Sequence, residues 1–324
     1  MCEYNLRLGY SSICNELRDL GIFSSRGMIR NSLNKPDGIE KAKLLALRNI
    51  QDLQKIIIWN ETQGIRLFRL TSQLFPHLDD ASIPKYNMDF ATESLKETGK
   101  LAKFFGHRIT MHPGQYNILN SPNKDVVVKT INELENHAKI LMTMGYKPEH
   151  GSVIVIHVGG VYGDKPSSLK RWKENFFLIP EFCRKYIVIE NDEFSYNVTD
   201  VLQLCEELGI PMVLDFFHNE VSNDKVKMTD ELLNRIAKTW KGIIPKFHFS
   251  VQLEGERRGS HGKTIDFLPL MLLKLPQILN QNVDCVLEVK DKEVSVLKMY
   301  RKYFKKMENP MNSYSKIEWK LHIC

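Results

Sequence analysis

Features of secreted, membrane-spanning and redox proteins are missing from this chain. No charged-then-apolar leader opens it, and no apolar run approaches the roughly 20 residues needed to span a bilayer. Six cysteines are scattered along 324 residues without a C-x-x-C pair, so neither a zinc knuckle nor a dithiol redox motif is predicted. We therefore expect a soluble intracellular protein, cytoplasmic or nuclear according to its source, whose cysteines are thiols.

Signals of a multidomain chain are also missing. We find no internal repeat, no low-complexity segment and no Gly/Ser linker. The pair Gly159-Gly160 lacks the G-x-G-x-x-G spacing of a dinucleotide-binding loop. With 43% hydrophobic residues, the chain is long enough to bury one large core. We predict one domain over residues 1–310, followed by a short C-terminal tail at 311–324.

The charge balance permits a polyanionic partner without requiring one. The net charge is +6, and basic residues gather at Arg257, Arg258 and Lys263 and again in the run Lys298–Lys306. Either cluster could equally be a solvated face. Charge alone therefore leaves a nucleic-acid partner open.

Short apolar runs alternate with longer segments of helical periodicity from one end of the chain to the other. The runs that read as strands are Leu6–Tyr10, Ile65–Leu70, Arg108–His112, Val153–Val158, Ile187–Asn191, Met212–Phe217, Lys246–Ser250 and Val283–Val289. The helical segments are Ile39–Asn60, Thr92–Phe105, Lys124–Met144, Val198–Leu208, Thr229–Trp240 and Phe267–Leu279, with a less regular one at Leu169–Cys183. Eight strands in such an alternation close a parallel barrel, so we predict an α/β fold, a single (β/α)8 barrel of the TIM type.

Ionisable side chains stand at or near the C-terminal ends of these strands, where parallel barrels hold their active sites. They are Tyr10, His112, His157, Glu190, Asp215, His218, His248 and Glu288, and Lys246 lies in the seventh strand with His248. A lone histidine in an apolar strand, such as His157, is usually a hydrogen-bonded core residue, but core packing does not account for so many strands ending this way. Imidazoles and carboxylates without thiolates suit manganese, iron or zinc. We predict a multinuclear site for divalent metals that activates water and binds the oxygens of a phosphodiester.

Five segments closely resemble signature segments of the UV damage endonuclease family. They are Thr110–Tyr116 (T-M-H-P-G-Q-Y), Ile156–Gly163, Ile189–Glu193 (I-E-N-D-E), Leu214–His218 and Pro245–His248. M-H-P-G-Q-Y and E-N-D-E in this order are specific signals, and the resemblance extends from Leu8 to about Lys292. It implies a DNA repair endonuclease, similar to the endonuclease IV type of barrel nuclease, that hydrolyses the phosphodiester 5′ of pyrimidine dimers, 6-4 photoproducts and, as a secondary activity, abasic sites. Such lesions pair and stack poorly, which makes them easier to displace from the helix.

The resemblance also implies a cofactor and its ligands. The family is usually described with up to three divalent ions, manganese in particular. The implied ligands are His112, His157 and Glu190 for the first ion, Glu190, Asp215, His248 and Glu288 for the second, and His218 and His261 for the third. Lys246 matches a family lysine that can be carboxylated, and the implied catalytic residues are Glu190, Lys246 and His248.

The implied partner is double-stranded DNA that contains ultraviolet lesions, bound by a monomer. Gln115 and Tyr116 match residues that push into the duplex at the lesion, and Tyr10 matches a tyrosine that lines the pocket for the displaced bases. Arg257 and Arg258 form a basic loop that we expect to contact DNA.

Two positions depart from the family pattern. Relatives place a histidine a few residues after the proline that follows the second strand; here His77 comes early, and Asp80 stands nearer the expected position. Some relatives carry an asparagine near Cys14. The polar loop Asn15–Asn34 receives no definite role, although its serines and arginines suggest DNA contact.

Two other functions remain open at this point. A sugar isomerase of the xylose isomerase type also uses a barrel with a carboxylate and histidine metal site. The second alternative is a damage-binding protein without catalytic activity. The complete set of metal ligands counts against it, because such a protein would not need them. Gln115-Tyr116 and the basic loop at Arg257-Arg258 favour a DNA substrate over a sugar.

Overall fold

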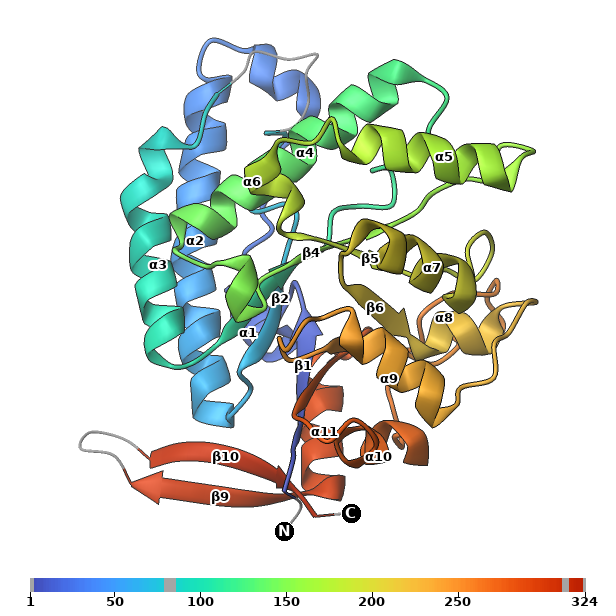
Figure 1. Cartoon of the computed structure of the whole chain (residues 1–324). Coiled ribbons are helices and arrows are strands. Elements are labelled where there is room, and N and C mark those ends of the chain that lie inside the picture. Colours follow the sequence, from blue (N-terminus) through green and yellow to red (C-terminus); the bar gives the residue numbers. More distant parts are fainter. Residues whose placement is uncertain (1–2, 79–85, 311–314, 323–324) are drawn as a thin grey trace. The chain divides into compact units, whose positions relative to one another are not determined.

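The computed structural model describes residues 3–78, 86–310 and 315–322. Within these ranges, eight strands follow one another in chain order around a closed barrel (Figure 1). They are β1 (Leu6–Ser11), β2 (Leu67–Leu70), β3 (Arg108–Met111), β4 (Ile154–His157), β5 (Ile187–Glu190), β6 (Met212–Asp215), β7 (Lys246–Phe249) and β8 (Val283–Leu287). The predicted TIM-type barrel is confirmed.

Two compact units make up the chain. The first unit comprises Met1–Ser11, Trp59–Phe68 and Val188–Cys324, and the second comprises Ser12–Ile58 and Arg69–Ile187. The first contains the helices α7 (Val198–Leu208), α8 (Phe216–Val221), α9 (Asp230–Lys238), α10 (Leu270–Ile278) and α11 (Glu293–Tyr303). The second contains α1 (Asn15–Asp19), most of α2 (Gly38–Gln63), α3 (Thr92–Phe104), α4 (Lys124–Thr143), α5 (Lys165–Phe176), α6 (Glu181–Arg184) and three short 3-10 helices at Arg30–Asn34, Asp89–Ala91 and Pro148–His150.

The register of the first unit's strands decides which side chains share one end of the barrel. Asp215 of β6 lies opposite His248 of β7, and Phe247 of β7 lies opposite Cys285 of β8. β8 in turn pairs in parallel with β1. Gly9 in β1 permits close packing there, because a Cβ atom at that position would lie 2.2 Å from the Leu67 carbonyl oxygen.

Local sequence signals account for several helix ends. The Asn197 side chain accepts hydrogen bonds at the start of α7, and the Asp200 carboxylate accepts one back from the Asn197 amide, which completes a capping box. Gly209 ends the same helix in the left-handed conformation. Asp164 caps α5, which carries a proline in its first turn. These signals keep α7 within the predicted bounds.

Most element ends differ from the sequence prediction by one to three residues, and three larger differences have a local cause. The sixth strand was expected to reach Phe217, but Asp215 caps α8, so the helix begins at Phe216. The irregular segment Leu169–Cys183 is divided between α5 and α6, since Pro180 precedes the second helix. The loop Asn15–Asn34 contains two short helices and is held to α2 by an ion pair of 2.6 Å between Arg26 and Asp52.

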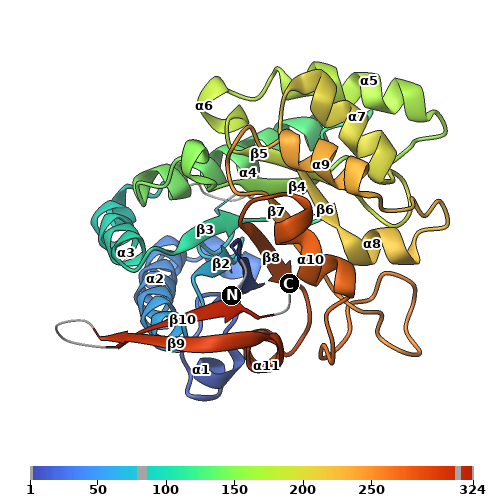
Figure 2. The same ribbon diagram turned by 60° about the horizontal axis from the view of Figure 1, so that its bottom comes forward.

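The C-terminal segment expected to be a tail contains a strand. β10 (Ser315–Leu321) pairs antiparallel with β9 (Phe304–Pro310), next to α11 and the start of β1 (Figure 2). The Trp319 ring stacks on Tyr300 of α11 at a centroid distance of 5.1 Å. The Asn5 side chain donates to the Trp319 carbonyl and accepts from the Leu321 amide. This hairpin therefore packs onto the first unit as part of it.

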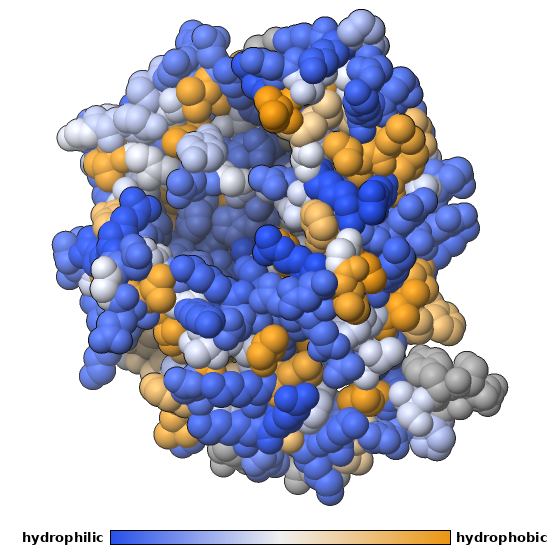
Figure 3. All heavy atoms as spheres, turned by 180° about the vertical axis from the view of Figure 1, so that it is seen from behind, coloured by the Kyte–Doolittle hydropathy of each residue, from blue (hydrophilic) through white to orange (hydrophobic). Residues whose placement is uncertain are grey.

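The surface is mostly hydrophilic on the face that Figure 3 shows, with hydrophobic residues in small groups. Among the described residues, no helix is both long enough and apolar enough to cross a bilayer. Cys14, Cys183, Cys205 and Cys285 are buried thiols, as expected from the spacing of the cysteines.

Candidate metal centre

Five candidate ligands of the first unit lie at or directly after the ends of the consecutive strands β5 to β8. Glu190 ends β5, Asp215 ends β6, His218 lies in the first turn of α8, His248 lies near the end of β7, and Glu288 follows β8 directly. All five are buried. Strand alternation puts Lys246 on the same face of β7 as His248, and Lys246 is completely buried as well.

Glu190 is shared by two groups of candidate ligands. Its carboxylate lies with Asp215 and His218 in one group and with His248 and Glu288 in another, and within each group the ligating atoms lie within 4.8 Å of one another. The Nδ1 atom of His248 is 2.7 Å from Oε1 of Glu190 and 3.0 Å from Oε1 of Glu288. A carboxylate placed between two such groups can bridge two cations, which is the arrangement that the resemblance implied for Glu190.

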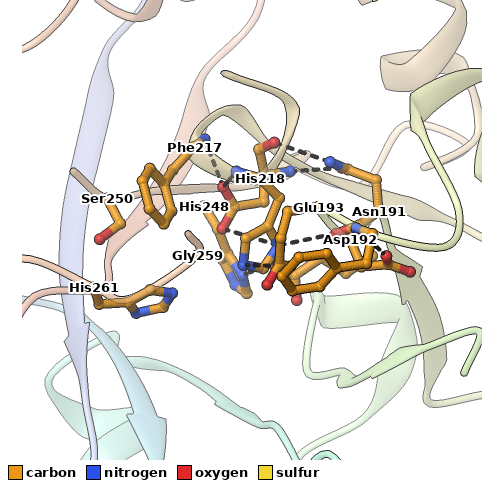
Figure 4. Close-up of polar contacts among 12 residues, drawn as sticks. Asn191, Asp192, Glu193, Phe217, His218, His248, Ser250, Gly259 and His261 are labelled. Carbon is orange, nitrogen blue, oxygen red and sulfur yellow. Dashed lines mark hydrogen bonds and ion pairs between the residues drawn. The ribbon is translucent and has the colours of Figure 1, made fainter. Parts of the chain in front are cut away.

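Backbone contacts orient the ligands of this centre. One oxygen of Asp215, Oδ1, accepts hydrogen bonds from the amides of Phe217 and His218 at 2.6 and 2.9 Å. The Nδ1 atom of His218 lies 3.0 Å from the Asn191 carbonyl oxygen (Figure 4). These contacts direct Oδ2 of Asp215 and Nε2 of His218 away from the backbone. Second-layer hydrogen bonds of this kind hold metal ligands in place.

The pKa values of the centre reflect an excess of negative charge. Burial lowers the pKa of His218, but the Asp215 and Glu190 carboxylates outweigh that effect and raise it to about 10. Burial likewise opposes protonation of His248, whose pKa is nevertheless raised by Glu190 and Glu288. The pKa of Asp215 is raised by its burial and also by the neighbouring carboxylates. The buried carboxylates therefore favour positive charge here, carried either by protons on the histidines or by a bound cation.

Divalent cations fit this requirement. Among the described residues, Oδ2 of Asp215 is buried without a hydrogen-bond partner, which is costly unless something positive binds there. The donors of the two groups that share Glu190 are carboxylate oxygens and imidazole nitrogens, and none of them is a thiolate. That donor set suits manganese, iron and zinc alike, so it does not distinguish among them.

His261 lies at the edge of the same centre. It follows the loop after β7, and its ring centroid lies 5.9 Å from that of His218 (Figure 4). Its Nδ1 atom is 3.8 Å from Oε2 of Glu288, and its side chain is 31% exposed. The two histidines expected to hold a third ion are therefore neighbours, and one of them is open to solvent.

The second unit brings the other two predicted histidines together. His112 follows β3, His157 ends β4, and their ring centroids lie 5.3 Å apart. The turn after His112 is held by Asn117, whose backbone and side-chain nitrogens both donate to the Gly114 carbonyl. Gln115 and Tyr116 are exposed on this turn, and the Tyr116 side chain is 80% exposed.

Five other residues were named from the sequence, and four of them lie within the described part of the chain. Tyr10 is completely buried, and its hydroxyl donates to Asn60 at 2.6 Å, so direct contact with a displaced base stays a prediction that this burial does not favour. The Nε2 atom of His77 lies 2.7 Å from the Met28 carbonyl oxygen, and Asp80 lies outside the described residues. Arg257 is exposed and Arg258 half-buried in the loop before His261.

Comparison with known proteins decides the family. The family model described as UV-endonuclease UvdE matches residues 6–320. The chain belongs to the UvdE family. The resemblance carried by the five sequence segments is confirmed, and the match includes most of the C-terminal hairpin.

Relatives of this UvdE family member come from viruses, bacteria and fungi. It is 48% identical over 303 residues to a putative UV-damage endonuclease of Acanthamoeba polyphaga mimivirus, with 92% of each chain covered. A UV DNA damage endonuclease of Bacillus pumilus is 30% identical over 97% of this chain and 99% of the relative. For the UV-damage endonuclease of Schizosaccharomyces pombe the identity is 34%, over 94% of this chain and 51% of the relative. This chain thus spans about half of the fungal protein.

Solved structures agree with the family and the fold. SacUVDE superposes with a TM-score of 0.78 at 33% identity, over 90% of this chain and 96% of that one. An L-ribulose 3-epimerase reaches a TM-score of 0.51 at 14% identity. At that identity the sugar epimerase shares the fold alone, so it lends no support to the isomerase alternative.

Asn191 is a supporting residue of the UvdE centre to which the sequence analysis gave no role. Its side chain donates to the Asp215 carbonyl at 3.0 Å and accepts from the Asp215 amide at 2.9 Å, which ties the end of β5 to the end of β6. Its place directly after Glu190 in the E-N-D-E segment was the only signal available.

Substitution of Asn191 with alanine is expected to destabilise the protein and loosen the metal ligands. Loss of two buried hydrogen bonds should cost about 2–3 kcal/mol and lower the melting temperature by roughly 4–6 °C. Manganese affinity should fall with it, because Asp215 loses its orientation. Calorimetry and metal titration measure the two effects. Asn87→Ala, which alters an exposed side chain, is the control, and equal behaviour of the two variants would show that Asn191 does not position Asp215.

Proposed function

We propose that this chain is a metal-dependent endonuclease that cuts DNA immediately 5′ of ultraviolet photoproducts, namely pyrimidine dimers and 6-4 photoproducts, and also at abasic sites. The observation that carries the proposal is the buried pair of ligand groups that share Glu190, in a chain of the UvdE family. The relatives described above are themselves named UV-damage endonucleases. Cleavage would leave a 3′-hydroxyl and a 5′-phosphate.

Up to three divalent ions are proposed to complete the centre, with manganese as the first candidate. His112 and His157 would share one ion with Glu190, as the resemblance of their segments implies. Asp215, His248 and Glu288 would hold the second ion with Glu190, and His218 and His261 the third. Divalent cations supply Lewis acidity for activating water and for neutralising charge on the phosphodiester oxygens.

The protein's own groups have three proposed roles in this reaction. Glu190 and His248, in contact at 2.7 Å, hold the two ligand groups in one arrangement and exclude water from the interior side. Asn191 and the start of α8 keep Asp215 in a single orientation before substrate arrives. Lys246 is buried on the same face of β7 as His248, and we propose that it acts there, carboxylated or as an amine.

The test of the function is a nicking assay on plasmid DNA. Supercoiled plasmid, irradiated or not, is incubated with the protein and manganese, and relaxed circles are quantified. Nicking confined to irradiated plasmid supports the proposal, as does ligation of the nick after lesion removal, which requires a 5′-phosphate and a 3′-hydroxyl. Equal nicking of both plasmids, or none of either, overturns it.

A double substitution of Gln115 and Tyr116 with alanine is expected to reduce selective cleavage of photoproduct DNA by roughly tenfold or more. The exposed Tyr116 ring would stack in the gap left by displaced bases, and an aromatic stacked on a base contributes about 1–3 kcal/mol. The measurement is the ratio of nicking rates on damaged and undamaged DNA.

Metal content and melting temperature serve as controls for the Gln115 and Tyr116 variant. Both should stay close to wild type, because these side chains are exposed and lie beyond the ligand His112. A lowered melting temperature with an unchanged damaged-to-undamaged ratio would mean that Tyr116 packs on the barrel rim and has no wedge role.

A further inference from the structure

A rigid turn after β5 presents an exposed phenylalanine beside the metal centre. The carboxylate of Asp192 accepts hydrogen bonds from the amides of Phe194, Ser195 and Tyr196, and the Asp192 amide donates to the Tyr196 carbonyl. Within this frame the Phe194 side chain is 59% exposed. The turn therefore holds an aromatic ring in solvent at a fixed position.

This ring lies one residue from a group that contacts the centre. Oε2 of Glu193 is 3.9 Å from Nε2 of His218. The loop that carries His261 packs closely against Glu193. A Cβ atom added at Gly259 of this loop would lie only 2.3 Å from Oε1 of Glu193. Gly259 also has a φ of 85°, which favours glycine. Figure 4 shows Glu193 and Gly259 beside His218 and His261.

Arg258 joins three loops at this place. Its guanidinium carbon lies 4.7 Å from the centroid of the Phe194 ring, and Nη1 donates to Oδ1 of Asn223 in the loop after α8. Within the part of the chain that the structure describes, the contacts of the Arg258 guanidinium are this ring and the Asn223 amide, and it forms no ion pair there. A cation over one face of an exposed ring leaves the ring available for further stacking.

We propose that Phe194 and Arg258 form a second DNA-binding element beside the metal centre, distinct from the turn at Gln115 and Tyr116. Phe194 stacks on a nucleobase that has left the helix at the lesion, and Arg258 binds a phosphate next to it. Isolated exposed phenylalanines are common on protein surfaces and need no explanation. This one has a hydrogen-bonded frame, an arginine over its ring and a position four residues after Glu190, and that combination matches the stacking-plus-charge pattern by which proteins hold unpaired DNA. The inference rests on the proposed function.

The experiment separates stacking from charge. A short fluorescein-labelled duplex with one central thymine dimer, and the same duplex without it, are titrated with protein by fluorescence anisotropy at several salt concentrations. A Glu190→Gln background prevents cleavage during the measurement. The variants are Phe194→Ala, Arg258→Gln and Arg258→Lys. Phe177→Ala is the matched control, since Phe177 is 63% exposed and also lies under an arginine, Arg184, at 5.4 Å.

Each variant has a distinct expected result. Phe194→Ala weakens binding of the damaged duplex by roughly tenfold, leaves the undamaged duplex nearly unaffected and does not change the salt dependence. Arg258→Gln weakens binding of both duplexes and lowers the slope of log affinity against log salt by about 1, whereas Arg258→Lys restores that slope. Phe177→Ala resembles the parent protein throughout.

Two outcomes overturn the inference in different ways. If the parent discriminates damaged from undamaged DNA but Phe194→Ala behaves like Phe177→Ala, or weakens both duplexes equally, the stacking role is wrong and the proposed function stands. If the Glu190→Gln parent binds damaged and undamaged duplexes equally, the proposed function fails and the inference fails with it. If Arg258→Gln leaves the slope of log affinity against log salt unchanged, Arg258 does not bind a phosphate and that part of the inference is wrong.

Discussion

Replacement of Glu190 with glutamine is expected to abolish DNA nicking while the fold and the binding of damaged DNA stay largely intact. Glu190 is the side chain that both ligand groups share. A neutral glutamine amide in place of its carboxylate would therefore weaken two cation sites at once. Loss of several kcal/mol of electrostatic stabilisation corresponds to a rate decrease of roughly a thousandfold or more. Single-turnover nicking of irradiated DNA measures the rate, and anisotropy measures the binding.

The isosteric change keeps this experiment interpretable. Glutamine has the size of glutamate, so the packing around His248 should survive, and phosphate contacts far from the centre should still supply most of the affinity. Glu231→Gln, an exposed change on α9, is the control. Near-normal turnover of the Glu190 variant would contradict the shared-ligand assignment.

Removal of metal is expected to make the protein less stable as the pH rises. The pKa of His218 is raised to about 10, mainly by Asp215 and Glu190 acting against the effect of burial, and that of His248 is raised as well. A histidine whose folded-state pKa is raised stabilises the fold below its unfolded-state pKa, and that stability is lost as the pH rises through the folded-state pKa. The raised pKa of Asp215 acts in the same direction. Metal-free protein should therefore lose stability between about pH 6.5 and about pH 10.

Manganese should remove most of this pH dependence, because cations take the place of the protons among the carboxylates. Several kcal/mol of lost stability corresponds to roughly 5–10 °C in melting temperature, so the stabilisation on adding manganese should grow by about that amount across the window. Calorimetry of chelator-treated and manganese-supplemented protein at several pH values measures it. His218→Gln should flatten the metal-free curve, whereas His150→Gln, an exposed change, should not. Metal-free stability that is constant or rises with pH would contradict the charge balance described for the centre.

Position along the strands made the grouping of the candidate metal ligands predictable. Each of Glu190, Asp215 and His248 is the last or a late residue of a short apolar run, and parallel strands in a barrel end at one rim. The periodicity of the apolar residues was sufficient to place those runs. The boundaries were less certain where one residue served two elements, as at Asp215, which ends β6 and also caps α8.

Contacts between distant residues could not be predicted in the same way. Three such contacts depend on how separate loops and strands pack. Asn191 ties β5 to β6, Tyr10 is buried against Asn60, and Arg258 lies over Phe194. A hydrogen bond or a ring contact between residues 24, 50 or 64 positions apart leaves no periodic trace in the chain. The strand in the C-terminal segment was missed for a related reason, since its residues are stabilised by Tyr300 and Asn5.

The amino-acid order was enough for the fold class, the family and the candidate ligands, because alternating apolar periods and strand-terminal polar residues are local patterns. The tertiary structure was needed to place Glu190 in both ligand groups, to bury Oδ2 of Asp215 without a hydrogen-bond partner among the described residues and to set Phe194 beside Arg258. Burial, shared charge and loop packing arise only when segments far apart in the chain meet. For that reason the pKa of His218 and the exposure of Phe194 are properties of the folded protein and cannot be read from either residue's neighbours in the sequence.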